Sequence, residues 1–220
     1  PRSTLRHPLF PYTTLFRSLT WTGLTDGNGV RYDEDVYRLR VGVTADTGDL
    51  TLTPSASSPT PGVYAVNVQI APVDLPITIE AAIWDGIRLT HDMPHKLWRN
   101  RWPSYWDHQF LALNGRLRGA VGIWAADAEF RYKDLFYLVN DQGISVSLSS
   151  MNTPPFEKLT AAEGVTWHVQ AFDHHWAQAA AAYRTWRDAH RTFAERPDWA
   201  LGISFVNNGV NASENWLNVL

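Results

Sequence analysis

Apolar and polar residues alternate one by one through most of the middle of the sequence, and this period constrains the fold more than any other feature. In the first run, Tyr37, Leu39 and Val41 fall on one face of an extended chain, with charged neighbours on the other. Further runs begin at Tyr64, Ile77, Val121, Ile144 and Val165. Such alternation is typical of half-buried strands, and turn signals separate the runs. We therefore predict a mainly β fold, an antiparallel β-sandwich of roughly ten strands over residues 19–172.

One turn signal is sharper than the others. Asn114-Gly115 lies between two apolar runs, and this dipeptide suits the positive φ angles at both centres of a two-residue type I′ turn. We expect a tight hairpin centred there.

The pattern changes near residue 173. Trp176, Ala179, Tyr183, Trp186 and His190 are spaced three and four apart, which predicts one amphipathic helix within 173–196. After Pro197, the apolar run 199–206 indicates a buried strand. A sandwich, a helix and then such a strand is the order expected where a β domain leads into an α/β domain. Because a (β/α)8 barrel needs about 250 residues, we interpret 197–220 as the start of a truncated barrel.

Composition excludes several classes of protein. Of the 220 residues, 45% are hydrophobic and 19% charged, with a formal net charge of −3. This balance fits a globular chain and argues against nucleic-acid binding driven by phosphate neutralisation. The sequence contains no uncharged apolar run of membrane-spanning length, so we expect no membrane insertion. Without cysteine, disulfides and thiolate chemistry are excluded.

The first 18 residues stand apart from the rest. Residues 9–18 read LFPYTTLFRS, which looks like a translated sequencing adapter. We expect residues 1–18 to be an artefact and disordered, outside the fold. The native N-terminus and any signal peptide are then unknown.

Several segments together resemble a family of glycoside-hydrolase-like bacterial proteins. They are Gln109 to Leu113, Gly122 to Asp127 with Lys133, Trp167 to Phe172, Trp176 to Ala180, Tyr183 to Trp186, and Pro197 to Trp199. That family joins a large β-sandwich, a supersandwich, to a catalytic (β/α)8 barrel through a W-x-x-A-A-x-x-Y-R-x-W helix. The resemblance implies carbohydrate as substrate, no cofactor, and catalytic carboxylates on the barrel beyond Leu220. Location stays open, with a secreted or periplasmic bacterial protein as the expectation.

Tryptophan supplies the candidate binding residues. The chain has 11 tryptophans, and an indole offers a flat apolar face to a sugar ring. Residues 95–108, here called the tryptophan segment, contain three tryptophans and a tyrosine among arginines. We take Trp98, Trp102, Tyr105 and Trp106 of this segment as candidate substrate-binding residues. The structural alternative is a lid that seals the sandwich against the barrel. Asn207 and Asn208 follow the expected barrel strand and are candidates on that ground, with a plain turn equally compatible.

Two hypotheses about function remain. The first is the non-catalytic front part of a glycoside hydrolase, itself inactive, which meets carbohydrate through the barrel or the tryptophan segment. The second is a standalone carbohydrate-binding or adhesion module. We name no catalytic residue, and the histidines show no metal-ligand spacing. The sugar, the linkage, the stereochemical course and the oligomeric state are left open.

Overall fold

The computed structural model describes residues 17–73, 77–83, 86–90, 92, 97–115, 119–140, 143–173, 176–191 and 198–202. The chain divides into two compact units, residues 1–190 and 191–220. Within the described residues of the second unit there is one short helix, α2 (Asp198–Leu201).

The first unit contains a nine-stranded sheet among the described residues. Its strands, in spatial order, are β1 (Arg17–Thr25), β2 (Arg31–Val43), β3 (Leu50–Ser57), β13 (Thr166–Phe172), β9 (Ala120–Ala126), β8 (Phe110–Gly115), β5 (Ile77–Ala81) and β6 (Ile87–Leu89), and β12 (Ala161–Glu163) pairs with β3. Every pairing is antiparallel.

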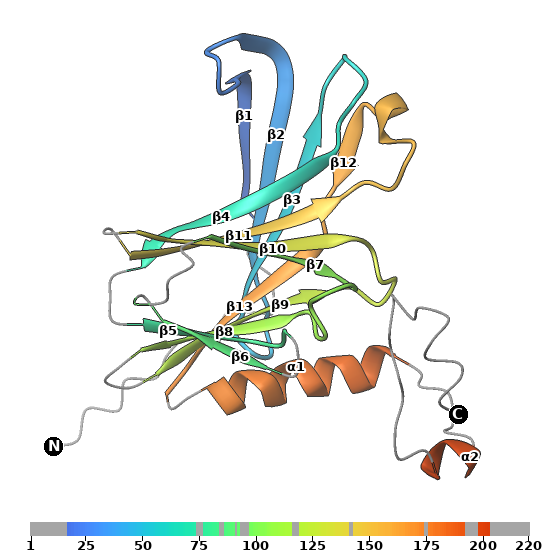
Figure 1. Ribbon diagram of the computed structural model, residues 1–220. Coiled ribbons are helices and arrows are strands. Elements are labelled where there is room, and N and C mark those ends of the chain that lie inside the picture. Colours follow the sequence, from blue (N-terminus) through green and yellow to red (C-terminus); the bar gives the residue numbers. More distant parts are fainter. Residues whose placement is uncertain are drawn as a thin grey trace, which may run out of the picture. The chain divides into compact units, whose positions relative to one another are not determined.

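A second, four-stranded sheet lies against one face of the first (Figure 1). It consists of β4 (Ala65–Val73), β11 (Gly143–Met151), β10 (Lys133–Asn140) and β7 (Leu97–Trp102), again all antiparallel. A short 3-10 helix, Phe156–Lys158, precedes β12.

The main hydrophobic core fills the space between the two sheets. On β11, Ile144, Val146 and Leu148 are fully buried, because alternate residues of a strand point to the same face. At the centre, the indoles of Trp106 and Trp167 stack at 6.2 Å between ring centroids, and both are fully buried. The alternation in the sequence therefore corresponds to this core, and the predicted mainly β antiparallel sandwich is confirmed.

Helix α1 (Trp176–His190) covers the opposite face of the large sheet (Figure 1). A second hydrophobic cluster forms there, where Ala179 and Tyr183 of α1 pack against Phe110, Ala112 and Trp124. The large sheet is thus buried on both faces at β8 and β9, which explains why these strands read as nearly continuous apolar runs. The predicted helix is present, and it packs on the sandwich.

Two local predictions were wrong. Asn114 pairs with Ala120, and the Gly115 N–H donates to the Gly119 carbonyl, so the turn is longer than two residues. The observed register sets Leu111 opposite Ile123, so that both strands bury the same face, and burial outweighs the local turn preference. The run beginning at residue 199 starts as helix α2, since a Pro-Asp pair favours a helix N-terminus.

The fold begins two residues earlier than predicted. Arg17 and Ser18 belong to β1, opposite Val41 and Arg40, whereas residues 1–18 are predicted to lie outside the fold. Residues 1–16 and 203–220 lie outside the described residues.

The packing of α1 on the sheet gives a stability prediction. A Cβ at Gly122 would lie 2.5 Å from the Ala179 Cβ and 3.1 Å from a ring carbon of Phe172. We expect Gly122→Ala to destabilise the fold by about 1–3 kcal/mol through overpacking, measured by urea or thermal unfolding. Gly27→Ala is the matched control, because a Cβ there meets nothing within 4 Å. Equal unfolding curves for the two variants would contradict the α1 packing.

Candidate functional site

The candidate tryptophan segment contributes mainly to the core. Trp106 is fully buried and Trp102 is 5% exposed, so neither presents a ring face on which a sugar could stack. Trp98 is half-buried against Tyr137, with the rings 6.3 Å apart. Tyr105 is 54% exposed. Asn207 and Asn208 lie outside the described residues.

The cause of this burial is visible in the segment itself. Residues 97–102 form strand β7, so Trp98, Asn100 and Trp102 share the inward face, while Arg99 and Arg101 point outward. The alternation of aromatic or amide residues with arginine was the signal for a strand. The prediction of a sugar-binding surface or a lid did not include this strand.

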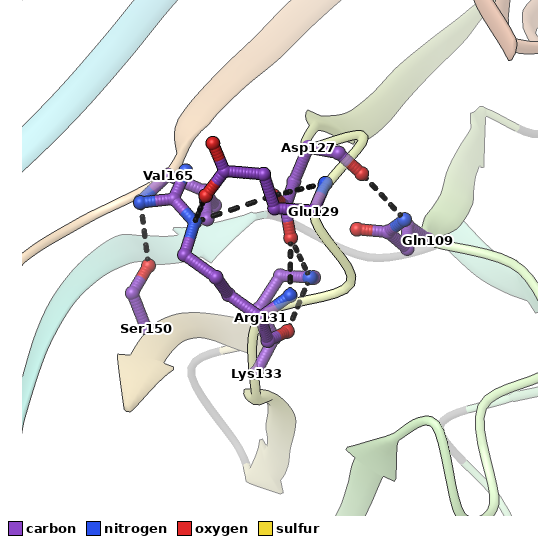
Figure 2. Close-up of polar contacts among 7 residues, drawn as sticks. All are labelled: Gln109, Asp127, Glu129, Arg131, Lys133, Ser150 and Val165. Carbon is purple, nitrogen blue, oxygen red and sulfur yellow. Dashed lines mark hydrogen bonds and ion pairs between the residues drawn. The ribbon is translucent and has the colours of Figure 1, made fainter. Parts of the chain in front are cut away.

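A buried polar cluster connects the two sheets where the chain passes from β9 to β10 (Figure 2). The Lys133 ammonium donates to Asp127 Oδ2 at 2.5 Å and to the Arg131 carbonyl at 2.6 Å. Arg131 donates to Asp127 Oδ1 at 3.2 Å, and the Gln109 side chain donates to the Asp127 carbonyl at 3.1 Å. The Lys133 and Asp127 side chains are 0% and 1% exposed, so the pair cannot meet a large ligand.

The electrostatics of the cluster favour the ionised pair. Burial by itself raises the pKa of Asp127, but the hydrogen bond and charge of Lys133, together with Arg131, outweigh it and hold the pKa below its ordinary value. Lys133 also lies 5.7 Å from the centre of the Trp102 ring, within cation–π range. The cluster is thus a structural element that fixes the crossing between the sheets.

A surface hollow lies between the β5–β6 hairpin and the N-terminal half of α1. It has a volume of about 670 Å³. Its lining includes charged, aromatic and apolar side chains: Glu80, Arg88, Asp107, His108, Phe110 and Trp176. Asp107 and His108, at the end of the tryptophan segment, are part of this lining.

Glu80 is the centre of a hydrogen-bond network in this hollow. Its Oε1 accepts from Arg88 Nε at 2.6 Å and from Asn114 Nδ2 at 3.1 Å. Asn114 Oδ1 in turn accepts from the Trp176 backbone N–H at 3.1 Å. Asn114 therefore supplies an acceptor for a backbone amide in the first turn of α1 and links the helix to strand β8.

Among the described residues, no group of three or more histidine, aspartate or glutamate side chains is placed to hold a metal ion. In the same part of the chain, no helix is long and apolar enough to cross a membrane.

The Asn114 contact can be tested by hydrogen exchange. We expect Asn114→Ala to cost about 1 kcal/mol and to speed exchange of the Trp176 amide, because its acceptor is lost. Asn114→Asp is made together with Glu80→Gln, so that two carboxylates do not face each other at the 3.1 Å contact. This double variant keeps an acceptor, and a negative charge is favourable at a helix N-terminus, so exchange should stay slow. The same exchange rate in both variants would contradict the contact.

The buried pair gives a prediction about pH. We expect Asp127→Asn to cost about 3–5 kcal/mol at pH 7, since Lys133 is left without its buried counter-ion. A lowered folded-state pKa means that the contribution of Asp127 is complete above about pH 4 and is lost as the pH falls through that pKa.

Urea unfolding at pH 7, 4 and 2.5 measures the difference between wild type and variant, which should shrink only at the lowest pH. Asp33→Asn is the control, because Asp33 forms an exposed pair with Arg31, worth about 1 kcal/mol or less. A difference that does not change with pH would contradict the ionised pair.

The fold, but not the sequence, matches known proteins. No protein-family model matches the sequence, and no curated protein sequence does so significantly. Among solved structures, the ligand-free α-N-acetylgalactosaminidase NagBb of Bifidobacterium bifidum aligns with a TM-score of 0.53 and 9% identity, over 80% of this chain and 30% of that one. The GH36 α-galactosidase AgaB of Geobacillus stearothermophilus aligns with a TM-score of 0.51 and 11% identity, over 81% of this chain and 30% of that one.

At these identities the likeness is one of fold. This chain spans about 30% of the length of each of the two enzymes. The resemblance to a glycoside-hydrolase β-sandwich, drawn from sequence segments, is thereby confirmed: the chain has a fold that these glycoside hydrolases contain.

Proposed function

We propose that this chain is the non-catalytic β-sandwich part of a glycoside hydrolase, whose catalytic groups lie on a (β/α)8 barrel outside the described residues. The observation that carries the proposal is the fold match, which covers 80% of this chain but 30% of NagBb. The whole protein would act on carbohydrate, and the sandwich would support the catalytic domain. Location in the cell envelope or outside it is compatible with this role.

The acidic groups of the sandwich favour a supporting role. Each buried carboxylate of the described residues has a polar side-chain partner. Asp127 and Asp134 form ion pairs with Lys133 and Arg99, and Asp49 Oδ2 lies 3.2 Å from His168 Nδ1. Glycoside hydrolysis needs two carboxylates that face a common substrate. Asp127 is buried in the core and Asp134 is already paired with Arg99, so neither is a free carboxylate that could act on a sugar.

The alternative is a standalone carbohydrate-binding or adhesion module. The exposed Tyr105 and the hollow beside Trp176, which is 39% exposed, are what favour it. The two functions differ in what the complete gene should encode.

Activity of the chain and the sequence of its gene test the proposal. We expect the purified chain to release no nitrophenol from 4-nitrophenyl α-galactoside or 4-nitrophenyl α-N-acetylgalactosaminide beyond a mock purification. We also expect the source reading frame to continue for about 250 residues with barrel periodicity. Turnover by the chain alone would contradict the non-catalytic role, and a stop codon close to Leu220 would favour the module.

A further inference from the structure

The outer face of the small sheet carries an ordered set of polar side chains. Antiparallel register places Asn67, Ser149, Asp134 and Arg101 in one row across the four strands, and Gln69, Ser147, Phe136 and Arg99 in the next. Ser145, Leu138 and Leu97 continue the third row. The face combines hydroxyls, amides, guanidinium groups, the carboxylate of Asp134 and three apolar side chains.

Three serines of β11, at positions 145, 147 and 149, form the floor of a trough on this face. Serine is short, and the flanking strands carry the longer side chains of Asn67 and Gln69 on one side and of Phe136 and Leu138 on the other. The trough has a volume of about 310 Å³, and the three serines and these four side chains line it. This hollow is separate from the one beside α1, since the two share no lining residue.

Two serine hydroxyls of the trough are placed to meet a ligand. Ser145 is 5% exposed as a residue and lines the trough, so its short side chain lies at the floor, facing the trough rather than the core. By contrast, the inward-facing Ser150 accepts a hydrogen bond from the Val165 N–H. Ser147 accepts from Asn67 at 3.2 Å and keeps its own proton to donate.

Charge on the face selects among ligand classes. Arg99 and Asp134 both line the trough and form an ion pair, so the charged groups of the lining balance. Arg99 is 46% exposed and faces solvent on this side. A lining without net charge does not suit nucleic acid, which requires a basic surface. A peptide strand would add to a sheet edge rather than to its face.

We propose that this trough binds a saccharide, with the sugar hydroxyls on Ser145, Ser147 and Arg99 and an apolar face of the ring on Phe136. The combination of donor–acceptor hydroxyls, amides and an aromatic wall matches a pyranose, which has hydroxyl edges and C–H faces. This inference goes beyond the proposed function, which needs no ligand on the sandwich.

Binding of the full chain to an array of plant, bacterial and animal oligosaccharides tests the proposal, with isothermal titration on the best ligand. We expect at least one saccharide to bind with a Kd of millimolar or below. Ser147→Leu fills the trough and should weaken binding more than tenfold. Ser145→Ala should weaken it about two- to tenfold, the range of one hydrogen bond. The unfolding temperature of this variant, measured alongside, separates lost binding from lost stability.

Thr20→Leu is the control, since Thr20 lies exposed on β1 of the other sheet. No saccharide binding on the array would overturn the proposal, as would binding that Ser147→Leu leaves unchanged. Sedimentation that shows a dimer broken by Ser147→Leu would instead assign the face to a second copy of the chain and also overturn it. All three results are independent of the glycosidase assay.

Discussion

The buried ion pair between Asp127 and Lys133 links the two sheets inside the core. It lies at the step from β9 in the large sheet to β10 in the small one, one of several places where the chain passes between the sheets. Burying two charges costs desolvation free energy, and only short contacts with further hydrogen bonds offset it. Since strand side chains alternate, an inward Lys133 sets Asp134 and Phe136 on the outer face. The polar trough of the small sheet therefore depends on a contact inside the core.

The large sheet is shared between two cores, and this accounts for the helix as much as for the sandwich. Leu111 and Ile123 face the small sheet, whereas Phe110 and Trp124 on the same strands face α1. Gly122 keeps the helix close, since Ala179 occupies the space where a side chain would be. A helix that buries its apolar stripe on the sheet belongs to the same folding unit as the strands, as the division after His190 indicates.

Periodicity alone predicted the sandwich and α1, because the strand period of two and the helix period of 3.6 both show which face of an element is buried. Periodicity does not show which other element that face packs against. Trp102 and Trp106 fit a sugar platform by composition, but a strand places Trp102 inward and Trp106 stacks on Trp167, sixty-one positions away in sequence. The trough could not be predicted from the sequence for the same reason. The serines of β11 form the polar side of a predicted strand, but the side chains that flank them belong to β4 and β10, which only the sheet register brings together.

The tryptophans and the serines have the opposite roles to those that the composition suggests. The indoles of the tryptophan segment mainly stabilise the core, and short hydroxyls form the surface that fits a sugar. Hydroxyl contacts replace contacts with water, so each adds little net free energy, and weak binding follows. Weak binding is sufficient if the sandwich is tethered to a catalytic domain, because a linked second site acts at millimolar effective concentration. On the proposed function, the trough would then hold a polymeric substrate near the barrel rather than select it.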